Sequence, residues 1–424
     1  MYRFSHVKTV QYGEGGNLLL QGSVLRPPAE LKALYGQAQC VYLDPPFMTG
    51  RTLSRKRPLG EKGWKKGTPT VKLEGFEDDF ENEREYLRLL RKLVTVSRSL
   101  LRDEGIFYLH LDWRMSAQAR LLCDKTFGKD AFLNEIIWSY ESGGRSKRFF
   151  PRKHDTILMY ARSDKYRFNL ERVGMPRQSN RKNHMARGVD ENGRTYSSIK
   201  SNGKIYRYYD DEPVYPSDVW NDISILQQKD PERTGYATQK PMKLMERLLK
   251  PVAEPGELVV DLCCGSGTTL AAAQALGLRY AGMDVSPAAV AVSWSRLKTE
   301  NLRVLCPCGQ DGAELLAEYD REKGRLRIHG LRISEGPLAE ADPLDALESW
   351  ETGHMEKDVF RPERTYRRSF QYPALVDEVR MAEAELPEAI LTTDAAGSTE
   401  TDENGNELLP VASGVYGYAG QNTL

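Results

Sequence analysis

The chain has 424 residues, a length that allows two or three domains of about 150 residues each. Apolar residues make up 40% of it, which is enough for a sizeable core. No run of about 18 apolar residues occurs, so a membrane-spanning helix is excluded. The first residues lack an apolar signal segment, and six cysteines in so long a chain do not form a disulfide scaffold. A cytoplasmic protein with reduced thiols is therefore expected.

The net charge of zero conceals two oppositely charged parts. Residues 331–424 contain 7 basic and 19 acidic residues, whereas the first 330 residues contain 53 basic and 41 acidic residues. Two blocks are especially basic, because 51–72 has 8 basic residues and one acid, and 141–210 has 17 basic and 7 acidic residues. This distribution predicts a polyanionic partner for the body of the chain and not for its tail.

Apolar runs and helical spacing predict strands that alternate with helices. Strands are expected at 17–23, 39–43, 105–111, 133–140, 156–160, 257–262 and 279–284. Helices are expected at 28–35, 81–104, 114–127, 242–252, 268–276 and 287–297, with Gly105 closing the second of them. The order indicates an α/β fold with a doubly wound, mostly parallel sheet covered on both faces. Residues 48–75 are expected to form a mobile loop, and residues 392–406 to be disordered.

These elements divide the chain into four regions. Residues 1–140 and 236–330 form two halves of one α/β domain. Residues 141–235, between the halves, form a less regular basic insertion that still contributes sheet strands such as 155–161. Residues 331–424 form an acidic, partly disordered C-terminal extension.

The most informative segment is Val259–Leu270, where a strand runs into Gly265-Ser-Gly267 and then into a helix. The glycines permit a tight turn and let a ligand approach the backbone. Asp284 ends the next strand, 23 residues after Asp261, where nucleotide-binding units place a ribose-binding carboxylate. A third small residue and the P-loop Gly-Lys-Ser/Thr are both absent, which disfavours NAD and ATP. A nucleoside without a pyrophosphate, such as S-adenosylmethionine, is favoured, with an ordinary strand-to-helix turn as the alternative.

A second segment, Asp44-Pro-Pro-Phe47, ends the strand expected at 39–43. Ligands bind at the carboxyl edge of a parallel sheet. Two prolines fix φ and remove backbone donors, so the carbonyls here can act as acceptors. A carboxylate beside such a carbonyl can accept both hydrogens of an exocyclic amino group, and an adjacent aromatic ring can stack on a planar base. The alternative is a Pro-Pro turn with an incidental aspartate.

These two segments, in this order, resemble amino-group DNA methyltransferases of the β arrangement. Other segments resemble motifs of the same family: Thr238-Gln-Lys-Pro241, Glu135-Ile-Ile-Trp138 with Gly143-Gly144, and His154-Asp-Thr-Ile-Leu-Met-Tyr160. The resemblance suggests as relatives the modification subunits of type III restriction systems and similar site-specific adenine methylases. The resemblance implies the S-adenosylmethionine-dependent methyltransferase fold in permuted order. Its catalytic half would be 1–140, its target-recognition region 141–235 and its cofactor-binding half 236–330.

The resemblance also implies site residues for methyl transfer to the N6 amino group of an adenine flipped out of the duplex. The catalytic residues would be Asp44, Pro45, Pro46 and Phe47, with the Asp44 carboxylate and the Pro45 carbonyl binding the amino group. Phe47 would stack on the base, and Trp138 or Tyr140 would form a second wall. The S-adenosylmethionine site would comprise Asp261, Cys263, Gly265, Ser266, Gly267 and Thr268 for the methionine half, Asp284 for the ribose, and Thr238, Gln239 and Lys240 for the methionine carboxylate.

No metal is required by this chemistry. Cys306-Pro-Cys308 resembles half a zinc site, but no second pair has ligand spacing. His110 and His154 are interpreted as structural, and Cys263 and Cys264 as packing around the turn.

Double-stranded DNA is the expected partner, in a bacterial cytoplasm and on the nucleoid. The candidate DNA-binding residues are Arg145, Lys147, Arg148, Arg152 and Lys153, because basic side chains neutralise phosphates. A solvated basic surface is the alternative. The basic block 51–72 could close over the flipped base or stay a solvated loop. A homodimer and association with a restriction subunit are further expectations.

Several functional alternatives stay open at this point. A cytosine-N4 enzyme is the nearest, although Ser more often replaces Asp in its tetrapeptide. Another alternative is an enzyme that methylates RNA or a protein amide. A third is a catalytically silent DNA-binding partner of a methylase complex. The acidic tail is interpreted by default as solubilising, with a partner contact or mimicry of DNA charge as alternatives.

Overall fold

The structure is a computed structural model. It describes residues 4–7, 11–12, 16–58, 70–141, 146–176, 185–227, 230–234, 236, 238–297 and 301–305, and nine strands further on. Those strands are β17 (Ala313–Asp320), β18 (Arg325–Ile333), β19 (Leu347–Glu356), β20 (Val359–Arg367), β21 (Glu378–Arg380), β22 (Ala389–Asp394), β23 (Glu400–Thr401), β24 (Glu407–Leu408) and β25 (Gly414–Tyr418).

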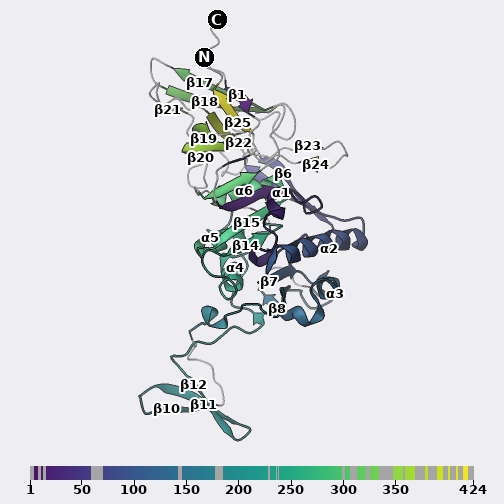
Figure 1. Ribbon diagram of the computed structural model, residues 1–424, viewed down its shortest axis with the longest axis vertical. Coiled ribbons are helices and arrows are strands. Elements are labelled where there is room, and N and C mark those ends of the chain that lie inside the picture. Colours follow the sequence, from purple (N-terminus) through teal and green to yellow (C-terminus); the bar gives the residue numbers. More distant parts are fainter. Residues whose placement is uncertain are drawn as a thin grey trace.

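A mostly parallel sheet forms the centre of the molecule, as expected (Figure 1). Its strands are β3 (Asn17–Gln21), β4 (Ala38–Leu43), β7 (Leu101–Leu111), β8 (Phe132–Ser139), β9 (His154–Ala161), β13 (Val219–Trp220), β14 (Leu258–Asp261), β15 (Arg279–Asp284) and β16 (Leu302–Leu305). They lie in the order β16-β3-β15-β14-β4-β7-β9-β8-β13. Neighbours from β16 to β7 are parallel, whereas β9 is antiparallel to both β7 and β8.

Helices cover both faces of this sheet, so the predicted α/β fold is confirmed. One face packs against α4 (Met242–Leu249), α5 (Thr268–Ala275) and α6 (Pro287–Leu297). The other packs against α1 (Ala29–Lys32), α2 (Glu83–Leu100) and α3 (Ser116–Phe127). Successive residues of β4 alternate between the two cores, Cys40 and Tyr42 on one face and Val41 and Leu43 on the other. Burial on both faces explains why these strands are continuous apolar runs.

The second long helix ends earlier than the sequence predicts. α2 stops at Leu100, and Leu101 is already extended and begins β7, so the expectation that Gly105 closes the helix is wrong. Gly105 instead lies inside the strand, where an added Cβ would come 3.0 Å from the carbonyl oxygen of Ala38 in β4. The glycine is therefore needed for close approach of two neighbouring strands.

The loop expected at 48–75 is partly a β-hairpin. β5 (Arg51–Pro58) and β6 (Thr70–Asp78) pair in antiparallel fashion. This pairing satisfies backbone groups that a loop would leave to water. The basic composition of the block concealed the strands.

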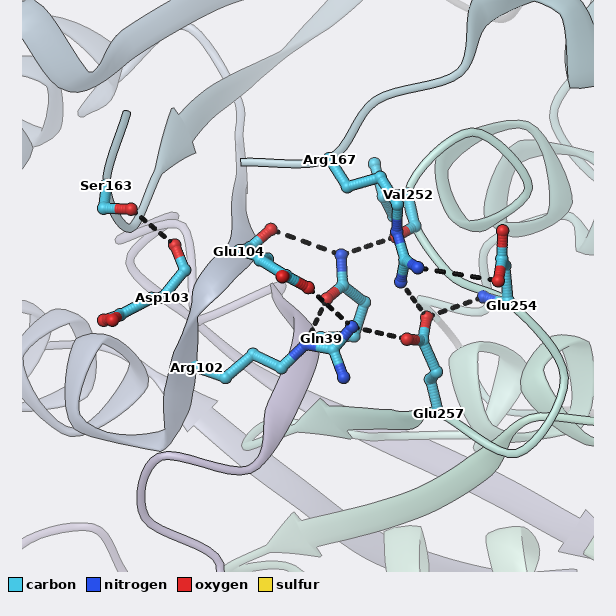
Figure 2. Close-up of polar contacts among 9 residues, drawn as sticks. All are labelled: Gln39, Arg102, Asp103, Glu104, Ser163, Arg167, Val252, Glu254 and Glu257. Carbon is cyan, nitrogen blue, oxygen red and sulfur yellow. Dashed lines mark hydrogen bonds and ion pairs between the residues drawn. The ribbon is translucent and has the colours of Figure 1, made fainter. Parts of the chain in front are cut away.

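A polar network lies at the amino ends of the central strands, opposite the edge where ligands are expected (Figure 2). The buried Gln39 donates to the carbonyl oxygen of Val252 over 2.6 Å and accepts from Arg102 Nε over 2.6 Å. Arg102 and Arg167 both bind the carboxylate of Glu257, which precedes β14. Burial opposes ionisation of Glu257, but its hydrogen bonds hold its pKa below the ordinary value. The network ties β4, β7 and β14 together, so the opposite ends of these strands are held in register.

Two further groups of strands lie at opposite ends of the molecule (Figure 1). The antiparallel sheet of β10 (Ala186–Val189), β11 (Thr195–Ser201) and β12 (Lys204–Tyr209) projects from the insertion. Beyond β16 the sheet continues through β2 (Gln11–Tyr12), strands of the C-terminal extension and β1 (Phe4–Val7). Of residues 392–406, the described ones belong to strands β22 and β23, and 395–399 and 402–406 lie outside the described residues. The domain boundaries stay a prediction.

In the part of the chain that the structure describes, no helix is long and apolar enough to cross a membrane.

Candidate active site

The tetrapeptide and the glycine turn leave the same edge of the sheet. β4 and β14 are parallel neighbours, and Asp261 pairs with Tyr42. Asp44 and Cys263, two residues further along each strand, therefore both lie just beyond the carboxyl edge. Burial raises the pKa of Asp261, and the negative charge of Asp44 contributes to the same shift. The sequence segments expected to bind the amino group and the nucleoside are thus brought together.

Asp44 is held by an ion pair that sequence reasoning did not foresee. Lys240 Nζ lies 2.5 Å from Asp44 Oδ2, and the two side chains are 12% and 17% exposed. Lys240 Nζ also lies 5.0 Å from the centroid of the Phe47 ring. Lys240 was expected at the methionine carboxylate; an ammonium group has three protons, so one contact with Asp44 leaves donors for a second anion.

A buried chain of polar groups lies behind Phe47. The Phe47 ring stacks on His110 with centroids 6.1 Å apart and planes 27° apart. His110 is fully buried, with Nδ1 2.7 Å from the hydroxyl of Tyr42 and Nε2 3.1 Å from Asp155 Oδ2. Tyr140 donates its hydroxyl to Asp155 Oδ1 over 2.9 Å. His110, interpreted from sequence as structural, therefore supports the ring that is expected to stack on the base.

The two candidates for a second wall lie at different depths. Trp138 is 2% exposed, and its indole N–H donates to the carbonyl oxygen of Ile223 over 2.8 Å. Its ring packs edge-on against both His110 and Tyr140. This placement puts Trp138 behind the site as a support, and leaves the half-buried Tyr140 as the better candidate for contact with a base.

The backbone after the tetrapeptide is anchored by Asp78, a residue that sequence reasoning missed. Its buried carboxylate accepts from the backbone N–H groups of Met48 and Thr49 over 2.7 and 3.0 Å. Met48 has φ of 57°, a left-handed conformation that a non-glycine residue rarely adopts. Asp78 thus stabilises a strained turn next to Phe47. A buried acid at the end of β6 carries no local pattern that could have revealed this contact.

The glycine turn has the geometry that its sequence predicts. Gly265 and Gly267 have φ of 51° and 70°. A Cβ on Gly267 would come 2.7 Å from Ser293 Oγ, so no side chain fits there. Ser293 in α6 also donates to the carbonyl oxygen of Gly265 over 2.9 Å. The turn is therefore held against α6, with α5 beginning at Thr268 beside the buried Ser266.

Two buried aspartates flank the turn. Asp261 Oδ1 accepts from the backbone N–H of Cys263 over 3.0 Å, and Asp284 Oδ2 accepts from that of Gly265 over 2.8 Å. Burial raises the pKa of Asp261 to about 7 and that of Asp284 to about 6. Asp284 is 8% exposed and Asp261 only 2%, so Asp284 is the more accessible of the two residues.

The segment before α4 closes the site from the other side. Tyr236, which sequence reasoning missed, is buried with its ring 3.2 Å from where a Cβ of Gly265 would stand. Gln239 uses its side chain inside its own segment, accepting from Thr234 and donating to the carbonyl oxygen of Glu232. Thr238 is exposed. The contacts expected of Thr238 and Gln239 with a methionine carboxylate stay predictions.

The expected DNA-binding residues lie immediately before β9. Lys147, Arg148 and Arg152 are exposed, and Lys153 is half-buried. Arg145 lies outside the described residues, as does the Cys306-Pro-Cys308 segment. Among the described residues, no group of three or more His, Cys, Asp or Glu side chains could hold a metal ion. Burial raises the pKa of both Cys263 and Cys264, so these thiols stay neutral.

Known proteins share this sequence pattern. The chain is 26% identical over 296 residues to type II methyltransferase M.EcaI of Enterobacter cloacae, covering 59% of this chain and 62% of that protein. It is 23% identical over 328 residues to DNA adenine methyltransferase YhdJ of Escherichia coli, covering 77% and 95%. The Mod subunit of the type III restriction-modification enzyme EcoPI from Escherichia phage P1 is 26% identical over 163 residues, covering 35% and 24%.

Among solved structures, the PvuII DNA methyltransferase, which is cytosine-N4-specific, is similar with a TM-score of 0.44 and 15% identity, covering 70% of this chain and 92% of that chain. The family described as DNA methylase, which groups N6 and N4 methyltransferases, matches residues 38–294. That match contains β4 with its tetrapeptide, β14 with its glycine turn, and everything between them. The chain therefore belongs to the N6/N4 DNA methylase family.

Proposed function

We propose that this protein transfers the methyl group of S-adenosylmethionine to the N6 amino group of an adenine flipped out of duplex DNA. One observation carries the proposal: parallel pairing of β4 and β14 sets Asp44 beside the glycine turn at one edge of the sheet. The Asp44 carboxylate, which would bind the amino group, and the glycine turn, which would bind the nucleoside, can then act in one reaction.

S-adenosylmethionine is the methyl donor of the family, and the residues present fit it. Gly265 and Gly267 present no side chains to a ligand, and Asp284 lies beside the turn with each carboxylate oxygen accepting from a backbone N–H group. A carboxylate has about four acceptor sites, so Asp284 can also accept from ribose hydroxyls. When bound, this cofactor supplies the activated methyl group.

The chain's own residues position and polarise the amino group. Asp44 Oδ2 is paired with Lys240, and Asp44 Oδ1 has no hydrogen-bond partner among the described residues. Oδ1 is therefore available to accept one N–H of the base, and the Pro45 carbonyl the other. Two such hydrogen bonds draw the nitrogen toward tetrahedral geometry and direct its lone pair away from the ring. Phe47, supported by His110, holds the plane of the base. Positioning supplies most of the rate enhancement in this scheme.

Adenine is favoured over cytosine by the aspartate at position 44, because serine more often opens the tetrapeptide of N4 enzymes. The printed name of the Escherichia coli relative, an adenine methyltransferase, supports the same choice. Cytosine N4 is the second candidate, because the family covers both amino groups. A silent DNA-binding partner is disfavoured by the intact tetrapeptide and turn.

The wider setting is proposed on the same grounds. The resemblance to a type III Mod subunit supports a role in restriction-modification with a restriction subunit as partner. A second copy of the chain is a further proposed partner. We place the protein in the cytoplasm, on the nucleoid. Residues Lys147, Arg148, Arg152 and Lys153 would contact the phosphates.

The test is identification of the methylated nucleoside. The protein is incubated with tritium-labelled S-adenosylmethionine and mixed unmodified genomic DNA, and the DNA is digested and separated. N6-methyl-2′-deoxyadenosine is expected. Label in N4-methylcytosine would replace the adenine assignment, and label in neither base would refute the proposed activity. Sequencing of the modified DNA then gives the recognition sequence.

A further inference from the structure

Three large aromatic side chains are exposed close to the candidate active site. Trp113 is 41% exposed, Phe149 is 56% exposed and Phe150 is 96% exposed. Trp113 follows β7, and the two phenylalanines precede β9. Exposed aromatic groups gathered in one place mark binding surfaces more often than isolated ones do.

Arginine side chains lie on two of these rings, Trp113 and Phe149. The guanidinium carbon of Arg152 is 3.5 Å from the Trp113 ring centroid and 4.7 Å from that of Phe149. Arg114 lies 5.0 Å from the same Trp113 ring. Arg114 also binds Asp112, whereas Arg152 has no carboxylate within ion-pair distance among the described residues. The cluster therefore carries net positive charge as well as apolar surface.

Strand register places this cluster at the catalytic edge. Leu109 of β7 pairs with Leu43, the residue before Asp44. Leu111 pairs with Thr156 of the antiparallel β9. Trp113 and Arg152 therefore lie two and four residues beyond this pair, on the side of the sheet edge from which Asp44 projects. A duplex whose base reaches Asp44 from this edge of the sheet would therefore lie next to them.

Aromatic and cationic groups together fit the two components of DNA. Base faces stack on aromatic rings, and each such contact adds to the affinity for DNA. Guanidinium groups neutralise phosphates. When a base leaves the duplex, its neighbours lose a stacking partner, and proteins that deform DNA often insert an apolar side chain at such a step.

We propose that one cluster acts as a DNA-inserting wedge, and this inference rests on the proposed function. The wedge consists of Trp113, Phe149 and Phe150 with Arg114 and Arg152. Phe150 enters the duplex where the target base has left, and stacks on the base pairs that remain. Trp113 and Arg152 support the loop that carries it. The cluster thereby stabilises the opened duplex, while Asp44 and Phe47 hold the flipped base.

The experiment compares two duplexes built around the recognition sequence found by sequencing. One is fully paired, and the other has an abasic site opposite the target base, so that extrusion needs no pair to be broken. The Phe150→Ala variant is expected to lose about tenfold in kcat/KM on the paired duplex, as loss of one stacking contact implies, and less than about threefold on the abasic duplex. Phe150→Tyr, which keeps a ring, is expected to restore the rate on the paired duplex.

Phe168→Ala is the matched control. Phe168 is 40% exposed but follows Arg167, whose N–H donates to Glu104 at the opposite edge of the sheet, and this variant should match the wild type on both duplexes. Equal losses of Phe150→Ala on the two duplexes, or no loss on either, would reject the wedge while wild-type methylation still supports the proposed function. A wild-type protein that methylates neither duplex would reject both.

Discussion

Lys240 Nζ lies 2.5 Å from Asp44 Oδ2, across 196 positions of sequence. Asp44 belongs to the segment that would hold the target base, and Lys240 to the segment that precedes α4 beside the glycine turn. Because both side chains are mostly buried, removal of one leaves the other charge without its partner. The ion pair therefore links the segment expected to bind the base to the segment expected to bind the cofactor.

Replacement of Lys240 tests this coupling. Lys240→Met leaves Asp44 free to rotate away from the amino group, and a displacement of about 1 Å costs on the order of 100-fold in rate. We expect a loss of about that size in single-turnover methylation at saturating S-adenosylmethionine. Lys243→Met, at an exposed position of α4, is the control and should be unaffected. A Lys240→Met rate near that of the wild type would show that the ion pair does not position Asp44.

Two variants, Gly267→Ala and Gly256→Ala, distinguish the effect of backbone strain from the effect of disrupting the glycine turn. Both glycines have positive φ, 70° and 86°, so backbone strain alone should cost about 1 kcal/mol of stability in each variant. Only at Gly267 does the new Cβ meet a neighbour, since nothing lies within 4 Å at Gly256. Calorimetric titration should therefore show weakened S-adenosylmethionine binding for Gly267→Ala alone. Equal binding by the two variants would remove the turn from the cofactor site.

The raised pKa of Asp261 predicts a particular pH dependence of stability. In the native state its carboxyl stays protonated up to about pH 7, whereas in the unfolded chain it ionises near pH 4. The native state thus binds the extra proton between these values, and this group's contribution to stability falls as pH rises from 4 to 7. The Asp261→Asn variant has no titratable group at this position. As pH rises from 5 to 8, its urea midpoint should therefore rise relative to that of the wild type. Asp130→Asn, at an exposed site, should follow the wild type; parallel curves for Asp261→Asn would contradict the raised pKa.

Charge removal before β9 tests the DNA surface. Each phosphate contact contributes about 0.9 to the slope of log affinity against log salt. The double variant Lys147→Gln, Arg148→Gln should bind DNA more weakly and lower that slope by about 2. Arg91→Gln with Lys92→Gln on the exposed side of α2 removes the same charge elsewhere and should leave the slope unchanged. Similar slopes for both double variants would move the DNA surface away from this segment.

Much of the fold could be predicted because local patterns carry it. The helix at 287–297 and the strand ending at Asp284 lie where they were expected, since apolar runs on a doubly covered sheet have no competing interpretation. The end of α2 could not be placed, because Leu101 continues the apolar pattern of the helix while its backbone already pairs with Ala38. The hairpin of β5 and β6 was missed because charge dominates its sequence.

The candidate site could be predicted in its segments but not in its contacts. The order of the tetrapeptide and the glycine turn was sufficient to place them on one sheet edge. The anchors Asp78 and Tyr236, and the ion pair of Lys240, depend on which chain segments meet after folding. Such contacts leave no periodicity or spacing in the sequence.

The most direct test of the account is methyl transfer by Asp44→Ala, measured together with S-adenosylmethionine binding. The account predicts that transfer to DNA is abolished, while calorimetry shows cofactor binding comparable to that of the wild type and of the control Asp79→Ala. Near-normal transfer by Asp44→Ala would contradict the assignment of Asp44 to the amino group of the target base.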